Sequence, residues 1–453
     1  MKLASIVLYA GKSTRFKSDT SKILHPLCGK AMFAWPLDEV LSLGGDVIAV
    51  IGHQAEQVQS EISSHYDDKV SFAMQTEQKG TGHAVMVAIQ KLANFKGTIL
   101  VLCGDTPLLT GATLQKLIKL QQSAQCDVAM LTTTLENPTG YGRIVRKSDE
   151  TIEQIIEENE ANDWQKLIQE INPGIYAFDA DFLRNALSQL KSSTHKGEYY
   201  ITDVVNSAIS IKISADEAIG INDRAQLADA EKILRKRINA RWMRDGVTCV
   251  NPKETYIDDA VQLSSDITLE PGVRLLGTTI ISNHVRIGAG SILNNTKVAE
   301  HAVIHPYSIC DDAVIGAHAQ IGPFARLRPK TRLDEYVKIG NFVEVKKSHF
   351  HTGAKANHLA YIGDAEIGEK SNIGAGTITC NYDGHNKHKT TIDDGVFIGS
   401  NSTLVAPLHI ESQAYVAAGS TINRDVPSDA LAIARGRQEN KEGYAKKIRS
   451  RFS

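Results

Sequence analysis

A glycine turn directly follows the first apolar run of the chain and is rich in groups that could bind phosphate. The segment LYAGKSTRF (8–16) places Gly11 after that run, and Arg15 and Lys22 follow closely. Backbone N–H groups in such a turn can cradle phosphates, and the two cations could neutralise them. A P-loop is excluded because its pattern needs a glycine where Ile6 stands. By spacing alone, an ordinary strand-to-helix turn is an equally good interpretation.

A carboxylate follows a second apolar run. Asp105 comes directly after Cys103 and Gly104, and in an open α/β sheet ligands bind at the carboxyl ends of the strands. Beside phosphates this carboxylate is a natural Mg²⁺ ligand; the alternative is an aspartate that caps the turn before Pro107. Further polar, glycine-rich segments are typical of binding loops: QTEQKGTGHA (75–84), PTGYGRI (138–144), INPGIY (171–176) and GEYYITD (197–203).

The second half of the chain has its own cations and histidines. Arg328 and Lys346 could bind phosphate, and His358 and Tyr361 lie in ANHLAYIGD (356–364). A histidine side chain ordinarily titrates near neutral pH, so it could take the proton that an ammonium group must lose before it attacks a thioester. Taken singly, a histidine is more often structural, and the chain has 15 of them. Four others in the same segments have no role that we can assign: His349, His351, His385 and His388.

Two sequence patterns indicate the elements that position these groups. Up to about residue 225, the apolar runs LASIVLYA, DVIAVIG and TILVLCGD alternate with longer amphipathic stretches. Short runs rich in Val, Ile and Leu are typical of buried parallel strands, and the stretches between them of crossover helices. The first half is therefore predicted to be an α/β domain, and the charged residues 225–246 a helical connector.

From residue 257 onward, aliphatic residues recur at every sixth position, which suits neither an α-helix nor an alternating strand. This is the hexapeptide signature of a parallel β-helix, and three hexapeptides per coil give about nine coils over residues 257–425. Segments 346–361 and 381–391 break the count, so both are candidate site segments. The first run of the count comprises Ile257, Leu263, Leu269, Leu275, Ile281, Ile287 and Leu293, and the count repeats from Ile315 to Val345 and from Ile392 to Ile422.

Composition excludes several classes of protein. A formal net charge of −2 over 453 residues excludes a strongly basic nucleic-acid binder and an acidic disordered chain. The six cysteines lack CxxC spacing, so they indicate neither a disulfide framework nor a zinc site and suit a reducing cytoplasm. The N-terminal apolar run is too short for a signal peptide, and no run approaches the roughly 20 residues that span a bilayer. We therefore expect a cytoplasmic protein without a nucleic-acid or membrane partner.

Taken together, the motifs resemble one family along essentially the whole chain. LYAGKSTRF, SKILH (21–25), QTEQKGTGHA, GDTPLL (104–109), TGYGRI, GEYYITD and the hexapeptide half occur in the order found in the bacterial bifunctional N-acetylglucosamine-1-phosphate uridyltransferase/glucosamine-1-phosphate N-acetyltransferase. The match is specific because other sugar nucleotidyltransferases share the first motif but not the later segments. The chain departs from the usual LAAGxGTRM motif at Tyr9 and Ser13, and Ser21 stands where proline commonly precedes the lysine.

The resemblance implies an α/β Rossmann-like uridyltransferase domain (1–224), a helical linker (225–246) and a left-handed β-helix N-acetyltransferase domain with a C-terminal tail (247–453). The second half would acetylate glucosamine 1-phosphate with acetyl-coenzyme A. The first half would then transfer uridyl from UTP to N-acetylglucosamine 1-phosphate and release pyrophosphate, with Mg²⁺. The family assembles as a homotrimer through the β-helix.

The resemblance also implies roles for residues of the first half. Arg15 and Lys22 would contact the phosphates in the transition state, and Asp105 and Asn222 would hold Mg²⁺. The nucleotide and the sugar would be bound by Leu8, Ala10, Gly11, Lys22, Gln75, Gly80, Thr81, Cys103, Gly104, Asp105, Gly142, Glu157, Asn172 and Asn222.

In the second half the resemblance selects His358 as the general base, because this histidine stands in the family's HLxYxGD pattern. Arg328 and Lys346 would bind the sugar phosphate, and Tyr361 and Asn372 the sugar. Acetyl-coenzyme A would be bound by Ala375, Asn381, Tyr382, Ser400, Ala418 and Arg435.

Two other functions remain open. One is a single-activity sugar-1-phosphate nucleotidyltransferase whose β-helix serves only assembly; the segment around His358 argues against it. The other is a non-catalytic interaction protein with the same two-part build, and the presence of Arg15, Lys22 and Asp105 argues against that.

Overall fold

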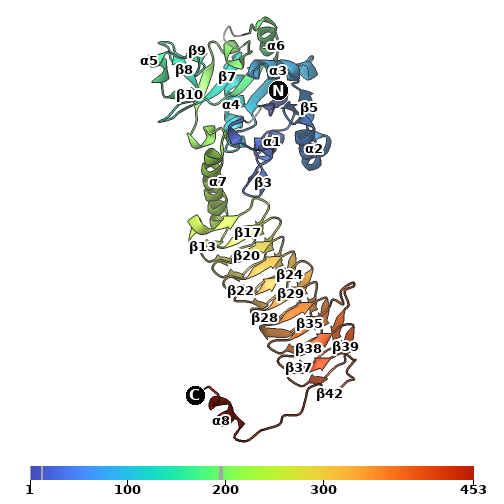
Figure 1. Ribbon diagram of the computed structural model, residues 1–453. Coiled ribbons are helices and arrows are strands. Elements are labelled where there is room, and N and C mark those ends of the chain that lie inside the picture. Colours follow the sequence, from blue (N-terminus) through green and yellow to red (C-terminus); the bar gives the residue numbers. More distant parts are fainter. Residues whose placement is uncertain (1, 12–13, 193–196, 453) are drawn as a thin grey trace. The chain divides into compact units, whose positions relative to one another are not determined.

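The computed structural model describes residues 2–11, 14–192 and 197–452 (Figure 1), so Ser13 lies outside the described residues. The chain divides into two compact units, residues 1–235 and 236–453. Helix α7 (Arg224–Arg244) occupies the residues for which a helical connector is predicted, and the boundary between the units falls within it. None of the helices in the described ranges has the length and apolar character needed to cross a membrane.

The first unit is built on a mixed ten-stranded sheet. Four of its strands are parallel and adjacent in the order β5-β4-β1-β6, and the three apolar runs predicted to be parallel strands are β1, β4 and β6. The other strands are mostly antiparallel. The bounds are β1 (Leu3–Leu8), β4 (Asp46–Ile51), β5 (Ser71–Met74), β6 (Thr98–Cys103), β7 (Val128–Thr134), β8 (Gly142–Arg146), β9 (Ile152–Ile156), β10 (Glu170–Asn172), β11 (Ile175–Asp179) and β12 (Ile209–Lys212), beside a small hairpin of β2 (Pro26–Leu27) and β3 (Lys30–Ala31).

Helices cover both faces of this sheet (Figure 1), because alternate residues of each strand point to opposite sides. Ala4 and Ile6 of β1 belong to one core, which includes residues of α3 (Thr81–Ile89) and α6 (Ala180–Gln189). Val7 belongs to the other core. Residues of α1 (Ala34–Leu43), α2 (Ala55–Tyr66) and α4 (Gly111–Ala124) pack there.

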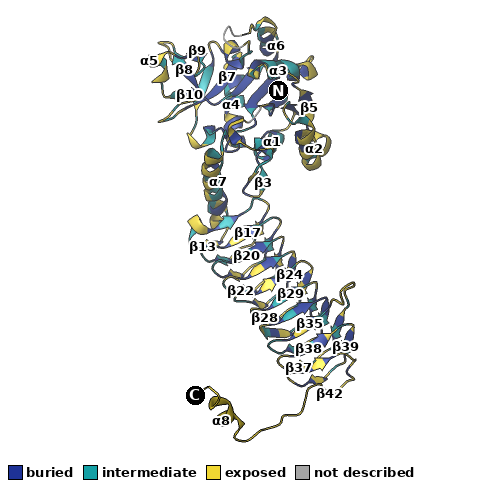
Figure 2. Ribbon diagram, viewed as in Figure 1, coloured by how far each residue is buried: buried dark blue, intermediate teal, exposed yellow. Residues whose placement is uncertain are grey.

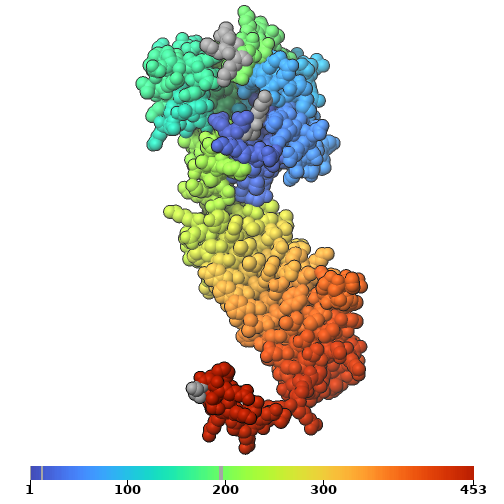
Figure 3. All heavy atoms as spheres, in the orientation of Figure 1, coloured from blue at the N-terminus to red at the C-terminus, as the bar shows by residue number. Residues whose placement is uncertain are grey.

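The second unit is a left-handed parallel β-helix of three sheets, which we call the first, second and third sheets; they have 11, 10 and 9 strands. Each strand pairs in parallel with its counterpart in the next coil. In Figure 3 the coils therefore follow one another as bands of gradually changing colour. A short helix, α8 (Tyr444–Arg449), lies in the C-terminal tail.

The strands of the β-helix are two to four residues long. The first sheet comprises β13 (Thr248–Cys249), β16 (Thr268–Leu269), β19 (Arg286–Ile287), β22 (Val303–Ile304), β25 (Gln320–Ile321), β28 (Lys338–Asn341), β31 (Lys355–His358), β34 (Asn372–Ile373), β37 (Phe397–Ile398), β40 (Tyr415–Val416) and β42 (Leu431–Ala432). The second comprises β14 (Tyr256–Ile257), β17 (Arg274–Leu276), β20 (Ile292–Asn294), β23 (Ile309–Asp311), β26 (Arg326–Leu327), β29 (Glu344–Lys346), β32 (Tyr361–Gly363), β35 (Ile378–Cys380), β38 (Thr403–Val405) and β41 (Thr421–Ile422). The third comprises β15 (Gln262–Leu263), β18 (Ile280–Ile281), β21 (Lys297–Val298), β24 (Ala313–Ile315), β27 (Thr331–Leu333), β30 (His349–Phe350), β33 (Ala365–Ile367), β36 (Thr390–Ile392) and β39 (Leu408–Ile410).

The aliphatic residues of the six-residue count form the interior of the β-helix, where Figure 2 shows buried residues along the strands. Every residue of the count named above is buried except Leu263, which is half-buried. The residue two places before each is also buried and often small, as at Ser291 and Ser402. A core of small and aliphatic side chains leaves little room for rings, which accounts for an aromatic share of only 6%.

The two segments that break the six-residue count differ in kind. Segment 346–361 contains no insertion: the chain passes from buried Val345 to buried Phe350 in one residue fewer than usual, with Lys347 at a positive φ of 46°. In segment 381–391 the chain leaves β35 and makes an extra loop before it re-enters the third sheet at β36. Only the second candidate segment is therefore an insertion.

Removal of one buried aliphatic side chain should test the stacked core. Ile321 of β25 is fully buried, and Ile309 of β23 is 45% exposed. We expect Ile321→Ala to lower the free energy of unfolding of the β-helix by about 2–5 kcal/mol. The matched change Ile309→Ala should cost at most about 1 kcal/mol. Urea unfolding followed by circular dichroism measures both, and equal losses would contradict a core built on the six-residue count.

Candidate functional site

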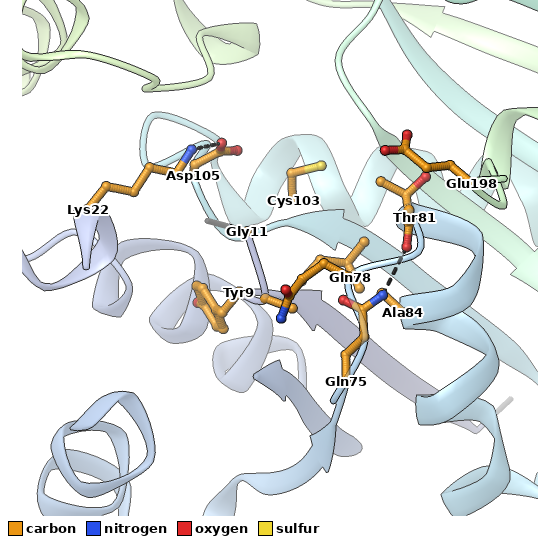
Figure 4. Close-up of a pocket in the computed structure, with 13 residues that line it drawn as sticks. Tyr9, Gly11, Lys22, Gln75, Gln78, Thr81, Ala84, Cys103, Asp105 and Glu198 are labelled. Atoms are coloured by element: carbon orange, nitrogen blue, oxygen red, sulfur yellow. Dashed lines mark hydrogen bonds and ion pairs between the residues drawn. The ribbon is translucent and has the colours of Figure 1, made fainter. Parts of the chain in front are cut away.

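The carboxyl ends of β1 and β6 open into a cavity of about 290 Å³ (Figure 4). The chain leaves β1 toward β4 on one side, and β6 lies on the other, so this crevice is a topological switch point where α/β sheets bind ligands. Four lining residues were not named individually as site residues, although each lies in a segment singled out from the sequence: Tyr9, Gln78, Ala84 and Glu198. The predicted residues that line it are Leu8, Ala10, Gly11, Lys22, Gln75, Gly80, Thr81, Cys103 and Asp105.

A second cavity of about 190 Å³ adjoins the first, since Leu8, Thr81, Cys103 and Asp105 line both. Its remaining walls come from the sheet region of β8, β9 and β10 and from the segment before α7. The predicted residues that it adds are Gly142, Glu157, Asn172 and Asn222. Tyr141, Tyr176 and Thr202 also line it, and they come from the segments predicted to be binding loops. The residues predicted to bind nucleotide and those predicted to bind sugar therefore line two adjoining spaces.

Two cations and two oxygen ligands meet where the cavities join. The Lys22 ammonium donates to Asp105 Oδ2 at 2.5 Å, to the Ile221 carbonyl at 2.9 Å and to Asn222 Oδ1 at 3.4 Å. Arg15 also donates to Asn222 Oδ1, at 2.9 Å. Figure 4 shows Lys22 extended toward Asp105 across the mouth of the cavity. Four residues predicted to act on phosphates or Mg²⁺ thus form one cluster, although up to 207 positions separate them in the chain.

Tyr9, which departs from the family motif, is a packing residue. Its ring is buried, and its hydroxyl donates to the Phe33 carbonyl at 2.8 Å. A Cβ added to Gly104 would lie 2.0 Å from that ring, so the tyrosine requires a glycine at position 104. On the opposite wall Gly80 has a φ of 93°, and a Cβ there would lie 2.5 Å from the Tyr199 carbonyl oxygen. The carbonyl of Gly80 accepts from Gln75 at 3.0 Å, which closes this wall (Figure 4).

The second cavity contains a half-buried carboxylate and a buried amide. Glu157 accepts from the Thr202 hydroxyl at 3.0 Å, and burial raises the pKa of its carboxyl group. Asn172 donates to the Tyr176 hydroxyl at 2.6 Å and accepts from the Gly174 N–H at 2.9 Å. Burial, with a further contribution from the Asp105 charge, raises the pKa of Cys103 to about 12, so this cysteine stays a neutral thiol. These groups can bind hydroxyl and amide groups of a ligand.

In the β-helix, four predicted residues occupy the same corner of successive coils, between the first and second sheets. The Gly376 N–H donates to the Leu359 carbonyl at 3.0 Å, Asn401 to Ala375 at 2.7 Å, and Gly419 to Ser400 at 2.8 Å. These bonds stack one corner turn on the next. We call His358, Ala375, Ser400 and Ala418 the corner column. At about 4.8 Å per coil it is about 14 Å long.

His358 lies exposed at one end of the corner column, and a residue that the sequence did not predict holds its ring. His358 Nδ1 is 2.7 Å from the side-chain oxygen of Asn341, its register partner in the preceding coil. An amide oxygen only accepts, so Nδ1 carries the proton, and Nε2 is left with a free lone pair. That tautomer can act as a base.

The predicted phosphate and sugar residues lie on the second sheet beside the corner column. Lys346 pairs in register with Gly363, and the Tyr361 hydroxyl folds back over that glycine. Lys387, on the insertion, lies beside Lys346: the Lys346 ammonium lowers the pKa of Lys387. Two adjacent ammonium groups indicate an anion site. Arg328 is paired with Glu344 at 2.9 Å.

The remaining predicted residues lie on the insertion or follow the corner column. Asn381 donates to Asp364 Oδ2 at 2.6 Å, and the exposed Tyr382 donates to the Gly384 carbonyl at 2.5 Å. Asn372 begins β34, in the same coil as Ala375. The Arg435 Cδ atom lies 3.9 Å from the point where a Cβ on Gly419 would be, next to the last turn of the column.

Comparison with known proteins gives a family for the whole chain. The Nucleotidyl transferase family profile matches residues 4–222. The bifunctional protein GlmU of Geotalea uraniireducens is 46% identical over 451 residues, which cover 98% of this chain and 98% of that protein. The bifunctional protein GlmU of Exiguobacterium sp. is 45% identical over 99% of this chain and 100% of its own length. That of Geobacillus thermodenitrificans is 45% identical over 100% of this chain and 99% of its own length. The chain therefore belongs to the bifunctional GlmU family, the joined uridyltransferase and N-acetyltransferase of UDP-N-acetylglucosamine synthesis that its motifs resemble.

Proposed function

We propose that the two adjoining cavities of the first unit are the site of uridyl transfer, and that the corner column with the neighbouring second sheet is the site of acetyl transfer. The enzyme first acetylates glucosamine 1-phosphate and then joins the product to the uridyl group of UTP. The convergence of Lys22 and Arg15 on Asp105 and Asn222 carries the first assignment. The corner column carries the second.

In uridyl transfer, a phosphate oxygen of N-acetylglucosamine 1-phosphate attacks the α-phosphorus of UTP, and the bond to the leaving pyrophosphate breaks. Such a reaction needs its substrates held in line and the charge on the phosphoryl oxygens neutralised. Gly80 and Gln75 line the space for the nucleotide, while Glu157 and Asn172 line the space for the sugar. Lys22 and Arg15 lie where the two spaces meet, which suits contact with the phosphates in the transition state.

Asp105 and Asn222 are proposed to hold Mg²⁺. Their side-chain oxygens are hard donors of the kind that Mg²⁺ takes, and both lie within 3.4 Å of the same Lys22 nitrogen. When bound, the ion adds positive charge beside the phosphates. Lys22 and Arg15, which pair with these oxygens, then become available to the substrate.

In acetyl transfer, the amine of glucosamine 1-phosphate attacks the thioester carbonyl of acetyl-coenzyme A, and the coenzyme A thiolate leaves. Nε2 of His358 accepts the proton that the nitrogen loses. Lys346 with Lys387 is placed to bind the sugar phosphate, and the length of the corner column, about 14 Å, suits an extended pantetheine arm. Asn381, Tyr382 and Arg435 are proposed to contact the rest of the coenzyme.

A homotrimer assembled through the β-helix is also proposed. Tyr307, Phe324 and Phe342 form an exposed ridge, their rings stacked 5.3 and 5.5 Å apart, and Leu359 continues it to the start of the corner column. A continuous apolar ridge is typical of a surface that another protein chain covers. We further propose a cytoplasmic location, which six cysteines without CxxC spacing support, and the domain limits 1–224, 225–246 and 247–453.

If the two sites are separate, a substitution in one site should abolish only the activity of that site. We expect His358→Ala to lower coenzyme A release from acetyl-coenzyme A and glucosamine 1-phosphate by about 10²–10⁴-fold, since a general base is removed. Pyrophosphate release from UTP and N-acetylglucosamine 1-phosphate should be unchanged. Asp105→Ala should do the reverse. His301→Ala and Asp149→Ala, exposed positions outside both sites, serve as controls. Loss of both activities from either variant would contradict the assignment.

The half-buried carboxylate of Glu157 should make stability depend on pH. Because burial raises its folded-state pKa, the unfolded chain loses its proton first as pH rises. The free energy of unfolding then falls above the ordinary glutamate pKa of about 4.3. Glu157→Gln keeps an acceptor for Thr202 and removes this loss, so relative to wild type the variant should gain stability between about pH 4 and pH 8.

Glu170 is the matched control for Glu157. Its burial is outweighed by hydrogen bonds from Arg146, and its folded-state pKa is lowered. Relative to wild type, Glu170→Gln should therefore lose stability as pH rises toward the ordinary glutamate pKa of about 4.3, and the difference should stay constant above it. Urea unfolding of all three proteins at several pH values measures the two slopes. Slopes of the same sign would show that burial does not govern Glu157.

A further inference from the structure

We propose that Asp334, His349 and His351 bind a divalent transition-metal ion of the Zn²⁺ type on the outer face of the third sheet, with Glu366 orienting both histidines. In the described part of the chain, these three residues form the one group of histidine, cysteine or carboxylate side chains whose ligand atoms lie within 4.8 Å of each other. The two histidines belong to neither of the residue sets proposed above for the transfer reactions.

The β-helix register places these side chains together. Arg332 of β27, His349 of β30 and Glu366 of β33 are successive register partners. Asp334 lies two residues after Arg332, and His351 lies two residues after His349. The residues between them, Leu333 and Phe350, point into the core, so the period of two directs the row and its neighbours outward.

Four close contacts join two histidine rings to two carboxylate oxygens. Asp334 Oδ2 is 2.9 Å from His349 Nε2 and 3.3 Å from His351 Nδ1. Glu366 Oε1 is 3.4 Å from His349 Nδ1 and 2.8 Å from His351 Nε2. Each ring thus presents one nitrogen to each carboxylate, with the ring centroids 4.1 Å apart.

Two neutral histidine rings have fewer N–H protons than these four nitrogen–oxygen contacts require. An ionised carboxylate only accepts, and a neutral imidazole has one N–H. Two neutral rings therefore supply two donors for four contacts, and in the other two contacts a nitrogen lone pair faces an oxygen lone pair. Two imidazolium rings would supply four donors but would place like charges one against the other. A divalent cation between Asp334 and the rings removes the conflict, since all three groups then bind it through lone pairs.

The geometry suits such an ion. In a tetrahedral zinc site with bonds of about 2.0–2.2 Å, neighbouring donor atoms lie about 3.3–3.6 Å apart. Asp334 Oδ2 lies 3.3 Å from His351 Nδ1 and 2.9 Å from His349 Nε2, so the second pair moves apart by a few tenths of an ångström when the ion binds. With His349 Nε2 and His351 Nδ1 on the metal, the other two nitrogens carry protons and donate to Glu366. A carboxylate that receives the second N–H of a ligating histidine is the usual outer partner of zinc. Two imidazole ligands favour this class of ion over Mg²⁺ or Ca²⁺.

Neighbouring cations hold the outer oxygens of both carboxylates. Arg332 Nε lies 3.5 Å from Asp334 Oδ1, and Lys389 donates to Glu366 Oε2 at 2.8 Å. The inner oxygens are left to face the rings. The side chains of Asp334, His349 and His351 are 25–33% exposed, which leaves an entry path and a fourth position for water. An ion here would be bound by residues of two consecutive coils and would be linked to a third coil through Glu366. The site lies next to the insertion that carries Lys389.

Zinc binding to the full chain tests this proposal. Metal-free protein is titrated with Zn²⁺ by calorimetry, and bound zinc is counted after dialysis. We expect His349→Gln/His351→Gln to bind one equivalent less than wild type. The control His284→Gln/His301→Gln, which removes a stacked histidine pair from the same β-helix, should bind as wild type does. Glu366→Gln should keep the equivalent with about 10–100-fold weaker affinity, because the ligands remain and only their orientation is lost.

Co²⁺ gives an independent reading of the ligand set. Wild type loaded with Co²⁺ should show the visible absorption of a low-coordinate site, and Asp334→Asn should lose it. Circular dichroism establishes whether each variant is folded. If the double histidine variant is not folded, Asp334→Asn is used in its place in the zinc titration. Equal zinc stoichiometry and affinity in wild type and the ligand variants would overturn the proposal, as would absence of saturable binding; the cluster would then be a hydrogen-bonded ladder of protonated histidines.

Discussion

Parallel strand pairing is the constraint on which both units depend. It fixes the distance between neighbouring strands at about 4.8 Å and brings corresponding strand ends to the same edge. In the first unit the ends of β1 and β6 meet, and Gly11 and Asp105 line one cavity. In the second unit the same pairing repeats coil after coil, so that His358 and Ala418 share one corner although 60 positions separate them.

Charge is the second constraint, and it is satisfied locally. The Lys22 side chain is only 12% exposed and Arg15 is exposed, and Asp105 and Asn222 hold both in place before any substrate arrives. Such pre-organisation lowers the cost of ordering long side chains when phosphates bind. On the β-helix, Asn341 does the same for His358 by selecting one tautomer. A net charge of −2 for the chain therefore hides sites in which several charges lie within a few ångströms.

Much of this arrangement could be predicted from the sequence. The six-residue count predicts the β-helix because each coil side must bury one aliphatic side chain, and the apolar runs predict β1, β4 and β6. The family motifs predict residues that the fold brings together, such as Arg15 with Asn222. Other features depend on packing that has no local signal. The antiparallel β11 beside β6, the contact of Tyr9 with Gly104, and the roles of Asn341 and Lys387 appear only when distant segments meet. The shortened coil at Lys347 and the insertion at 381–391 both interrupt the six-residue count in the sequence. In the fold, the first removes one residue from a coil and the second adds a loop.

Separate expression of the two units tests the central claim most directly, that each site is complete within its own unit. Fragments 1–246 and 225–453 both keep α7, which contributes to both units. The first should release pyrophosphate from UTP and N-acetylglucosamine 1-phosphate, and the second should release coenzyme A from acetyl-coenzyme A and glucosamine 1-phosphate, each at a rate close to that of the full chain. Two folded fragments that lack their activities, and regain them only when mixed, would contradict the account.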